Sequence, residues 1–395
     1  MALVLAVAVP CARAATLFVG PTRELTLPSQ AAAAAHDGDT VEIDPGDYRG
    51  DAPTWTQNDL TIRGSGSAKP RIVGDGHTAA DRGLWAVDGR DVRIEDIEFM
   101  FAHVPAGNGA GLLLRGKNIT IVNCYFHDNE DGILATLATG SLTVERSEFA
   151  RNGMTNGQTH AMYVGRVDDL TVIGSYFHET RTGHHIKSRG LSNYILYNLL
   201  IDGEQGTASY AVEFPNGGRS VVVGNVIEKG PHAQNLAVIA NGLEGDMNGG
   251  INPQQNLYIA FNTIVSDNFA TIFLDTRTAL PLYAIDNIFA GTGQVLKGTG
   301  QLINNLFAPP NGRSPAEFAL PGNTGNVVVP DALFVDRKTR DYHLRAGSAA
   351  IGKAIDPAKL PGTAIKPEYQ HTGAAGMVHR AGAVDLGAYQ FDRTR

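Results

Sequence analysis

Two short runs in the middle of the chain combine side chains that could move protons beside a negatively charged substrate. Residues 183–190 read GHHIKSRG and residues 210–217 read YAVEFPNG. Lys187 is a candidate general base, because an amine crowded by other cations loses its proton more readily. Arg189 offers a planar fork that fits a carboxylate. Glu213 could orient the lysine or accept a hydrogen bond from a substrate hydroxyl.

The alternation of side chains along short strands predicts where these residues point. Neighbouring residues of a strand face opposite sides, and adjacent strands of a sheet lie about 4.8 Å apart. We therefore expect three apolar residues on successive strands to point inward, namely Met162, Ile186 and Val212. The residues that follow them then form one outward column, which consists of Tyr163, Lys187 and Glu213.

Residues of the same parity widen this column into a candidate site. His185 and Arg189 flank Lys187 two positions away, so we expect both to point outward. A structural alternative for the column is a ladder of surface ion pairs on a solvated face. His184 and His160 have the inward parity, and a structural role is the alternative for both. The candidate substrate-binding residues are Arg115 and Asp275, which extend the column, together with His160, His184 and Asn241.

These strands belong to a repeat that runs through most of the chain. Alternating apolar residues are followed by two small or polar residues and then by an aromatic or aliphatic one. The closing residues fall at positions 99, 126, 149, 177, 200, 227, 264, 289 and 307. A period near 25 residues is too short for propeller blades. It predicts an all-β fold, a right-handed parallel β-helix of about nine coils with three short strands per coil.

A second pattern predicts an internal ladder along this stack. The residue two positions before eight of the closing residues is small or polar. Stacked coils would bring these side chains into one column, as in cross-β assemblies. We expect glycine at the coil corners, because glycine adopts left-handed backbone conformations without strain. The predicted ladder consists of Cys124, Ser147, Ser175, Asn198, Asn225, Asn262, Asn287 and Asn305.

The ends of the chain differ from the repeat. An apolar run closes on Ala12-Arg13-Ala14, which resembles a secretory signal cut near Ala14. A short helix within residues 26–36 is expected to cap the open end of the coil. One coil carries an insertion from Asn241 to Gln254, which is either functional or disordered. The expected regions are a signal peptide at 1–14, a cap with the first coils at 15–80, the β-helix core with its groove at 81–310, and an irregular tail packed on the coil at 311–395.

Composition limits the classes of function. The chain has 395 residues, 46 of them glycine, 18% charged residues and a formal net charge of −8. The acidic balance argues against general nucleic-acid binding, and 43% apolar residues argue against a disordered chain. No apolar run is long enough to span a membrane, and no nucleotide-binding motif occurs. We expect a secreted or periplasmic monomer with Cys124 as a packed core thiol and no organic cofactor.

The stretch from Gly183 to about Gly218 resembles polysaccharide lyase family six, which contains chondroitinase-B-like and alginate lyases. The matching residues are Ile186-Lys187-Ser188 and the Asn-rich strand from Asn193 to Asn198. More broadly, residues 37–48 and 60–64 look like the opening of many pectate-lyase-like secreted proteins. This resemblance implies a parallel β-helix and an anionic polysaccharide as the binding partner.

Two departures from that family concern its second catalytic cation and its calcium ion. Glu213 stands where the family has a second basic residue, and Thr180 and Thr182 stand where it has acidic calcium ligands. No metal site is therefore assigned, although Ca²⁺ stays open as a cofactor. Other calcium donors would be Asp128, Glu130 and Asp131.

The chemistry that these residues fit is β-elimination on a uronic-acid polysaccharide. The proton at C5 of a uronate becomes acidic only when its carboxylate is neutralised, so the reaction needs a cation, a base and a proton donor. We expect Arg189 to hold the carboxylate and Lys187 to act as the base. Tyr163 or His185 would be the proton donor.

Two other functions fit the same sequence. A glycoside hydrolase needs two carboxyl groups about 5–9.5 Å apart, and Glu213 with Asp275 is the pair that the sequence offers. A non-catalytic polysaccharide-binding protein, or an epimerase-like protein that processes an exported polysaccharide, would bind without leaving a double bond.

Overall fold

The structure describes most of the chain. The computed structural model describes residues 14–136, 140–154, 158–245, 250–277, 280–355, 367–373, 376–380 and 384–392. The predicted signal peptide lies outside the described residues except for Ala14. Residues 246–249 of the insertion are also outside the described part.

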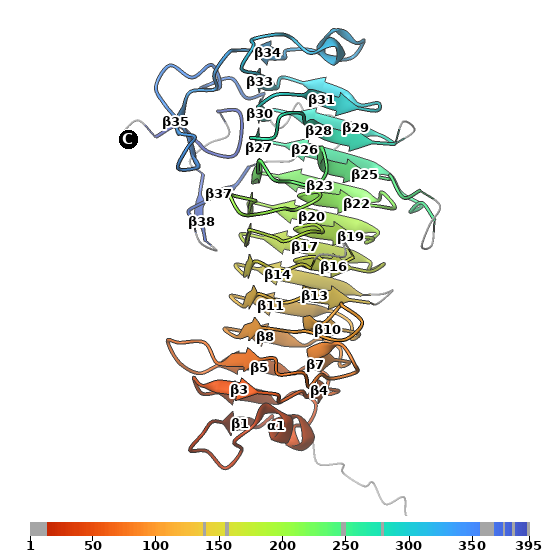
Figure 1. Ribbon diagram of the computed structural model, residues 1–395, viewed down its shortest axis with the longest axis vertical. Helices are drawn as coiled ribbons and strands as arrows, with labels where there is room; N and C mark the ends of the chain where they lie inside the picture. The colour runs from red at the N-terminus through yellow and green to blue at the C-terminus, as the bar shows by residue number, and fades with distance from the viewer. Residues whose placement is uncertain are drawn as a thin grey trace, which may run out of the picture.

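Three long parallel sheets wind around one core and form a right-handed parallel β-helix (Figure 1). From β5 to β33, consecutive strands enter sheets A, B and C in turn, so each strand pairs with the strand one coil away. Sheets A and B have 12 strands each and sheet C has 10.

The strands are short and evenly distributed over the three sheets. Sheet A consists of β1 (Thr16–Val19), β2 (Thr40–Ile43), β5 (Thr61–Gly64), β8 (Arg93–Glu95), β11 (Ile119–Val122), β14 (Ser141–Glu145), β17 (Asp169–Ile173), β20 (Ser192–Leu196), β23 (Arg219–Val223), β26 (Asn256–Ala260), β29 (Leu282–Ile285) and β32 (Gln301–Ile303). Sheet B consists of β3 (Asp47–Arg49), β6 (Arg71–Val73), β9 (Glu98–Met100), β12 (Tyr125–His127), β15 (Glu148–Ala150), β18 (Tyr176–His178), β21 (Leu199–Ile201), β24 (Val226–Lys229), β27 (Thr263–Ser266), β30 (Ile288–Ala290), β33 (Leu306–Ala308) and β34 (Val327–Val328). Sheet C consists of β4 (Thr54–Trp55), β7 (Gly83–Val87), β10 (Ala110–Leu114), β13 (Asp131–Ala135), β16 (Met162–Val164), β19 (Ile186–Ser188), β22 (Val212–Phe214), β25 (Ala237–Asn241), β28 (Ile272–Thr276) and β31 (Gln294–Lys297).

The predicted fold is confirmed, and the closing residues of the repeat lie in sheet B. Each of the nine falls in one strand of the series from β9 to β33. Four of them are phenylalanines whose rings stack inside the coil with centroids 5.1, 4.8 and 4.4 Å apart, from Phe99 through Phe126 and Phe149 to Phe177. The stack is longer than nine coils, because β3, β6 and β34 extend sheet B without the full phrase.

The predicted ladder is present and follows one corner of the coil. At its asparagine end, each side-chain oxygen accepts a hydrogen bond from the backbone N–H of the preceding rung. The distances are 2.8 Å from Asn198 to Asn225, 2.9 Å from Asn225 to Asn262 and 2.9 Å from Asn262 to Asn287. The ladder thus satisfies backbone groups that a sharp corner would leave buried without partners. Cys124 is the 1% exposed thiol at its other end, and burial raises its pKa to about 12.

The prediction that glycine occupies the corners is only partly correct. The residue before each ladder position has a positive φ, but among these corner residues only Gly174 and Gly224 are glycines. Larger residues such as Tyr197 (φ 56°) and Phe261 (φ 56°) adopt the same left-handed conformation. For such residues this conformation costs of order 1–3 kcal/mol, so the pairing of the stacked coils must offset it at every such corner.

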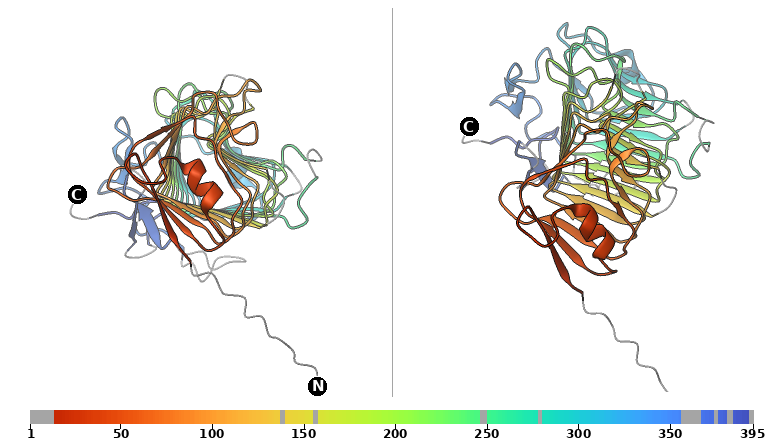
Figure 2. Two further views of the ribbon diagram at one scale, coloured as in Figure 1. Left: turned by 90° about the horizontal axis from the view of Figure 1, so that it is seen from below. Right: turned by 60° about the horizontal axis from the view of Figure 1, so that its bottom comes forward.

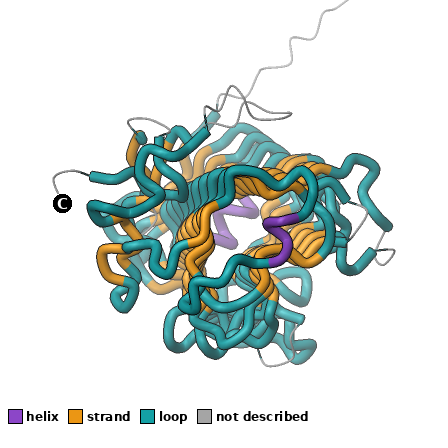
Figure 3. Tube along the Cα trace, turned by 90° about the horizontal axis from the view of Figure 1, so that it is seen from above, coloured by secondary structure: helices purple, strands orange, loops and turns teal. Residues whose placement is uncertain are grey.

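Both open ends of the coil are covered by short helices. Helix α1 (Pro28–Ala34) lies across the N-terminal opening (Figure 2), and its Ala31 and Ala32 are buried against the core. At the other end, seen from above in Figure 3, lies the 3₁₀ helix η1 (Ala316–Ala319). The Glu317 carboxylate there accepts backbone N–H groups of β31, including that of Val295 at 2.7 Å, which satisfies the last strand of sheet C.

The C-terminal part of the chain packs on the outside of sheets B and A. It contains two antiparallel pairs, β35 (Phe334–Asp336) with β36 (Asp341–Leu344) and β37 (Tyr369–His371) with β38 (Met377–His379). Tyr342 and Leu386 are buried together with Val265 and Ile288, which point outward from sheet B. The described residues of this segment do not cover sheet C, whose outer face carries the candidate site.

Substitution of a rung in the middle of the ladder should destabilise the fold. Asn262→Ala removes the acceptor of the Asn225 backbone N–H at 2.9 Å and the donor to the Val222 carbonyl at 2.8 Å. We expect the free energy of unfolding in urea to fall by about 2–4 kcal/mol. Asn311→Ala, on an exposed turn, is the matched control and should change it by less than about 0.5 kcal/mol. Equal midpoints for the two variants would contradict the role of the ladder.

Candidate active site

The outer face of sheet C brings together the residues that were predicted to share one column. Register pairs Tyr163 of β16 with Lys187 of β19, and Lys187 with Glu213 of β22. The residue before each of these three is completely buried, which confirms the predicted alternation within these strands. Two strands further along, the column reaches Asp275, whose carboxylate accepts a hydrogen bond from Lys297 at 3.1 Å.

The Lys187 amine is ion-paired with two carboxylates. Its Nζ lies 3.0 Å from Oε2 of Glu213 and 2.5 Å from Oε1 of Glu244. The side chains of Lys187 and Glu213 are only 11% and 4% exposed, so solvent screens this pair weakly. Glu244 comes from the described start of the insertion that follows β25, which places that insertion at the site.

The Arg189 guanidinium is held on three sides. Its Nη2 is paired with Oε2 of Glu244, its Nη1 donates to Oδ1 of Asn216 at 2.7 Å, and its Nε donates to Oη of Tyr163 at 3.0 Å. The two oxygens of the Glu244 carboxylate thus bridge Lys187 and Arg189. The structure contains a cation pair that already binds one carboxylate.

Two histidines support this group from inside. The Nε2 atom of His184 lies 3.4 Å from Oε2 of Glu213, and its Nδ1 lies 2.8 Å from Nδ1 of His160. The His184 ring stacks on Tyr210 at 4.9 Å, and the His160 ring lies 5.7 Å from that of Tyr163. Both histidines are buried, so they contact the site residues rather than the surface where a substrate would bind.

Both histidines are neutral at neutral pH. Burial, together with the charges of Lys187 and Arg189, lowers the pKa of His160 to about 3. Burial and the neighbouring His160 likewise place the pKa of His184 well below its ordinary value. They act here as hydrogen-bonding groups, not as cations.

The two carboxylates around Lys187 have opposite pKa shifts. Burial raises the pKa of Glu213, and the positive charge of Lys187 offsets this only in part. Burial also acts on Glu244, but hydrogen bonds from Lys187 and Arg189 outweigh it and lower its pKa. Glu213 therefore retains a proton to a higher pH than Glu244 does.

His185 does not belong to the site, and the prediction that it points outward is wrong. Its ring is completely buried, with Nε2 at 3.1 Å from Oδ1 of Asp202 and Nδ1 at 2.7 Å from the Thr180 hydroxyl. Alternation holds only within a strand, and β19 begins at Ile186. Gly183, with a φ of 80°, turns the chain just before it, so parity does not carry over to His185.

Two predicted substrate-binding residues also lie elsewhere. Asn241 is 2% exposed, because it shares the inward parity of Phe214 in the sheet register, and its amide donates to the Thr276 hydroxyl at 3.3 Å. Arg115 extends the register of Arg189 rather than that of Lys187, three strands away, or about 14 Å. It forms two hydrogen bonds of 2.7 Å with Asp88.

The positions where the resembling family has acidic calcium ligands do not fit calcium in this chain. The Thr180 hydroxyl is bonded to His185, and the Thr182 hydroxyl accepts a hydrogen bond from Gln234 at 3.2 Å. Within the described residues, no three His, Cys, Asp or Glu side chains are grouped so that they could hold a metal ion.

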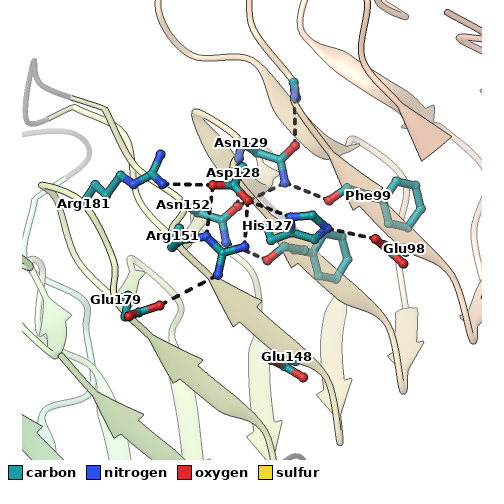
Figure 4. Close-up of polar contacts among 12 residues, drawn as sticks. Glu98, Phe99, His127, Asp128, Asn129, Glu148, Arg151, Asn152, Glu179 and Arg181 are labelled. Atoms are coloured by element: carbon teal, nitrogen blue, oxygen red, sulfur yellow. Dashed lines mark hydrogen bonds and ion pairs between the residues drawn. The ribbon is translucent and has the colours of Figure 1, made fainter. Parts of the chain in front are cut away.

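In the acidic turn at residues 128–131, Asp128 already binds three side chains (Figure 4). Asp128 is ion-paired with Arg151 at 2.8 Å, with Arg181 at 2.9 Å and with His127 at 2.8 Å. The carboxylate of Glu130 accepts the Gly109 N–H at 2.6 Å. The carboxylates of this turn bind groups of neighbouring coils, and the described residues here form no group that could hold a metal ion.

Sequence reasoning missed two residues of the site. Glu244 lies in the insertion, which the length of its coil identified as unusual, but no pattern singled out this residue. Asn216 follows β22 in a turn, outside the strand alternation that located Glu213. Both become visible only through their contacts with Arg189.

Comparisons with known proteins establish the fold. Residues 76–227 match the family described as a right handed beta helix region. The structure is similar to pectate lyase Pel9A, with a TM-score of 0.57 and 16% identity over 96% of each chain. It is also similar to an alginate lyase from Paenibacillus sp. str. FPU-7, with a TM-score of 0.51 and 15% identity over 74% of this chain and 97% of that chain. A family PL6 polysaccharide lyase from Pseudopedobacter saltans is similar with a TM-score of 0.40 and 12% identity over 82% of this chain and 96% of that chain.

No curated protein is significantly similar in sequence to this chain. The first two structural likenesses show that it has the β-helix fold of polysaccharide lyases. Within the described ranges, no helix is long and apolar enough to cross a membrane.

The corrected position of His185 predicts a structural role. His185→Gln removes a fully buried ring together with its contact to Oδ1 of Asp202 at 3.1 Å and its bond to the Thr180 hydroxyl, so we expect the free energy of unfolding to fall by about 2–4 kcal/mol. Urea unfolding measures this change, with His36→Gln, whose side chain is 83% exposed, as the control. A variant as stable as the unsubstituted protein would contradict the buried placement.

Proposed function

We propose that this protein is a polysaccharide lyase that cleaves a uronic-acid-containing polysaccharide by β-elimination. One observation carries the proposal: Lys187 and Arg189 both form ion pairs with the carboxylate of Glu244, and Arg189 also binds the Tyr163 hydroxyl. A uronate carboxylate could take the position of this internal carboxylate. The shared fold with a pectate lyase and an alginate lyase supports the same class of reaction.

Arg189 is the residue that would neutralise the substrate carboxylate. Its guanidinium is oriented by Asn216 and Tyr163, so two of its edges are fixed and the third faces Glu244. A planar, pre-oriented fork binds a carboxylate through two parallel hydrogen bonds. Neutralisation of that charge is the step that makes the adjacent C5 proton removable.

Lys187 would act as the base at C5. C5 of a uronate carries the carboxyl group, so a base that removes the C5 proton must lie next to the bound carboxylate. The Lys187 amine lies there, and Glu213 fixes its direction from the other side at 3.0 Å. Once a substrate replaces Glu244, the amine faces Arg189 and the buried Glu213 instead of an internal anion. The side chain is 11% exposed, and Lys187 can act as the base only in its neutral amine form.

Tyr163 would donate the proton to the departing oxygen. Its Oη accepts a hydrogen bond from Arg189, which leaves its own hydrogen directed away from the guanidinium. In the reaction the C5–H and C4–O bonds break and a C4=C5 double bond forms. Lys187 takes the C5 proton, the released chain end takes the Tyr163 proton, and solvent exchange restores both groups.

A glycoside hydrolase fits this geometry less well. Glu213 and Glu244 have opposite pKa shifts, which is the pattern of an acid and a nucleophile. However, the amine of Lys187 lies between their carboxylates and contacts both, so a glycosidic bond cannot occupy that space. Asp275, the partner considered from the sequence, lies two strands away and is paired with Lys297.

We further propose that the protein acts outside the cytoplasm. The support for this is the apolar segment that closes on Ala12-Arg13-Ala14 and the size of the substrate class, because polymeric uronates are encountered at or beyond the cell envelope.

Loss of the proposed base should abolish the release of unsaturated products. We expect the wild-type protein to produce oligosaccharides with ultraviolet-absorbing double bonds from at least one of polygalacturonate, alginate and the uronate-containing glycosaminoglycans. Lys187→Met should lower kcat by about 10²–10⁴-fold, whereas Lys297→Met, at the far end of the column, should not lower it.

The same assay separates the alternatives. Reducing ends without double bonds would indicate a hydrolase, and binding without products would indicate a non-catalytic protein. Parallel reactions with a chelator test whether the activity depends on calcium. Because the described residues offer no fitting set of calcium ligands, we expect the same rate with and without the chelator.

Removal of the internal carboxylate should strengthen substrate binding. Glu244→Gln keeps the shape of the side chain but ends its competition for Lys187 and Arg189. We expect the dissociation constant for a uronate oligosaccharide to fall by about tenfold, the scale of one charge-assisted contact. Calorimetry measures it for Glu244→Gln, with Lys187 retained, and for the unsubstituted protein. Glu204→Gln, an exposed partner of Arg340, should leave it unchanged. Weaker binding by Glu244→Gln would show that Glu244 orients the cations instead of competing for them.

A further inference from the structure

We propose that His160 and His184 hold Glu213 in its protonated form, so that Glu213 is a positioning residue that presents a neutral carboxyl group to Lys187. The proton assignment rests on the hydrogen-bond geometry and on the burial of the two histidines. Its consequence for a uronate substrate rests on the proposed function.

The chain of protons begins at His160. The backbone N–H of His184 donates to Nδ1 of His160 at 3.1 Å, so this nitrogen is an acceptor and carries no hydrogen. The His160 ring is neutral because it is buried next to two cations. Its single ring hydrogen is therefore on Nε2.

The orientation of His184 follows from that of His160. The Nδ1 atom of His184 lies 2.8 Å from the same acceptor nitrogen, so it must be the donor of that hydrogen bond. Since burial keeps His184 neutral as well, its Nε2 has no hydrogen and offers a lone pair.

This lone pair faces the carboxyl group of Glu213. The Nε2 atom of His184 is buried, has no hydrogen-bond partner and lies 3.4 Å from Oε2 of Glu213. An ionised Glu213 would place two lone pairs against each other in a site without solvent, whereas a protonated Glu213 donates its hydrogen to His184. The second arrangement satisfies both groups, and buried polar groups are satisfied in nearly all native structures.

The other charges around Glu213 are compatible with this state. Burial and Glu244 oppose the ionised carboxylate, whereas Lys187 and Arg189 favour it. Glu244 is already paired with both cations. An ammonium group is also attracted to the oxygen of a neutral carboxyl group, so Lys187 can keep its 3.0 Å contact with Oε2 of Glu213.

A neutral Glu213 suits a site that receives an anion. A substrate carboxylate would bind to Lys187 and Arg189 within a few ångströms of Glu213, where a buried negative charge would repel it strongly. The protonated carboxyl group fixes the Lys187 amine without adding that charge.

Carbon-13 NMR of protein labelled at the glutamate carboxyl carbons tests the proposal without any substrate. The signal that disappears in Glu213→Gln identifies Glu213. We expect its carboxyl group to titrate above the ordinary glutamate value of about 4.3. His184→Phe keeps the aromatic stack on Tyr210 but removes the lone pair, and it should shift the midpoint down by about one pH unit or more. His371→Phe, which replaces a buried histidine outside the site, is the control and should not shift it.

The proposal is overturned if Glu213 of the wild-type protein titrates at or below the ordinary value, or if His184→Phe leaves the midpoint unchanged. Should His184→Phe fail to fold, the wild-type titration alone decides. A second measurement is the pH dependence of unfolding. Since the pKa of Glu213 is raised in the folded state, its contribution is present at low pH and is lost as the pH rises through that pKa. Glu213→Gln should therefore become progressively more stable relative to the wild type as the pH rises above the ordinary glutamate value. A missing lyase activity would refute the proposed function but not this protonation state.

Discussion

The structure depends on the in-register pairing of each strand with the strand one coil away. That pairing satisfies the backbone groups of three sheets at once, and the asparagine ladder satisfies those at the corner between sheets A and B. The strength of this constraint is visible at the corners, where Tyr197 and Phe261 are held in left-handed conformations that they adopt at a cost. A backbone determined to this degree can hold outward side chains in fixed positions, which is what a site for polymer chemistry requires.

The same stacking converts distance in the sequence into proximity. Tyr163, Lys187 and Glu213 are separated by 24 and 26 residues, yet each is the direct register partner of the next. Toward the N-terminus this column is apolar, through Leu134 and Leu113. The site is therefore the place on sheet C where an apolar outer column becomes a charged one, and a single substitution there changes a contact of a neighbouring coil as well.

Side-chain directions could be predicted from the sequence only within strands, where successive residues face opposite sides of the sheet. The register of Lys187 with Glu213 lies within strands, so two-residue periodicity located it. The ladder lies at a corner, and its fixed position in the repeated phrase located it instead. His185 and Asn241 lie at strand ends, where a turn or the inward parity of the preceding coil decides the direction of the side chain. Glu244 lies in an insertion, so no repeat of the coil pattern could predict its position. Its position depends on contacts such as the Glu244 N–H donating to the Pro215 carbonyl at 3.2 Å, which no local pattern encodes.

The internal carboxylate of Glu244 has a consequence for how tightly the site can bind. Without it, Lys187 and Arg189 would be two neighbouring cations with little solvent, an arrangement that destabilises the folded state. With it, the cations stay paired and oriented. The binding free energy of an incoming carboxylate is then only the difference between its own contacts with the cations and the Glu244 contacts that it replaces. Such an exchange yields weak ground-state binding, which does not impair catalysis when the contacts that matter form as charge develops in the transition state. The same argument applies to Glu213: a neutral carboxyl group beside the lysine adds no repulsion before the reaction. The polar groups of this site thus serve to keep charge balanced through substrate exchange rather than to maximise affinity.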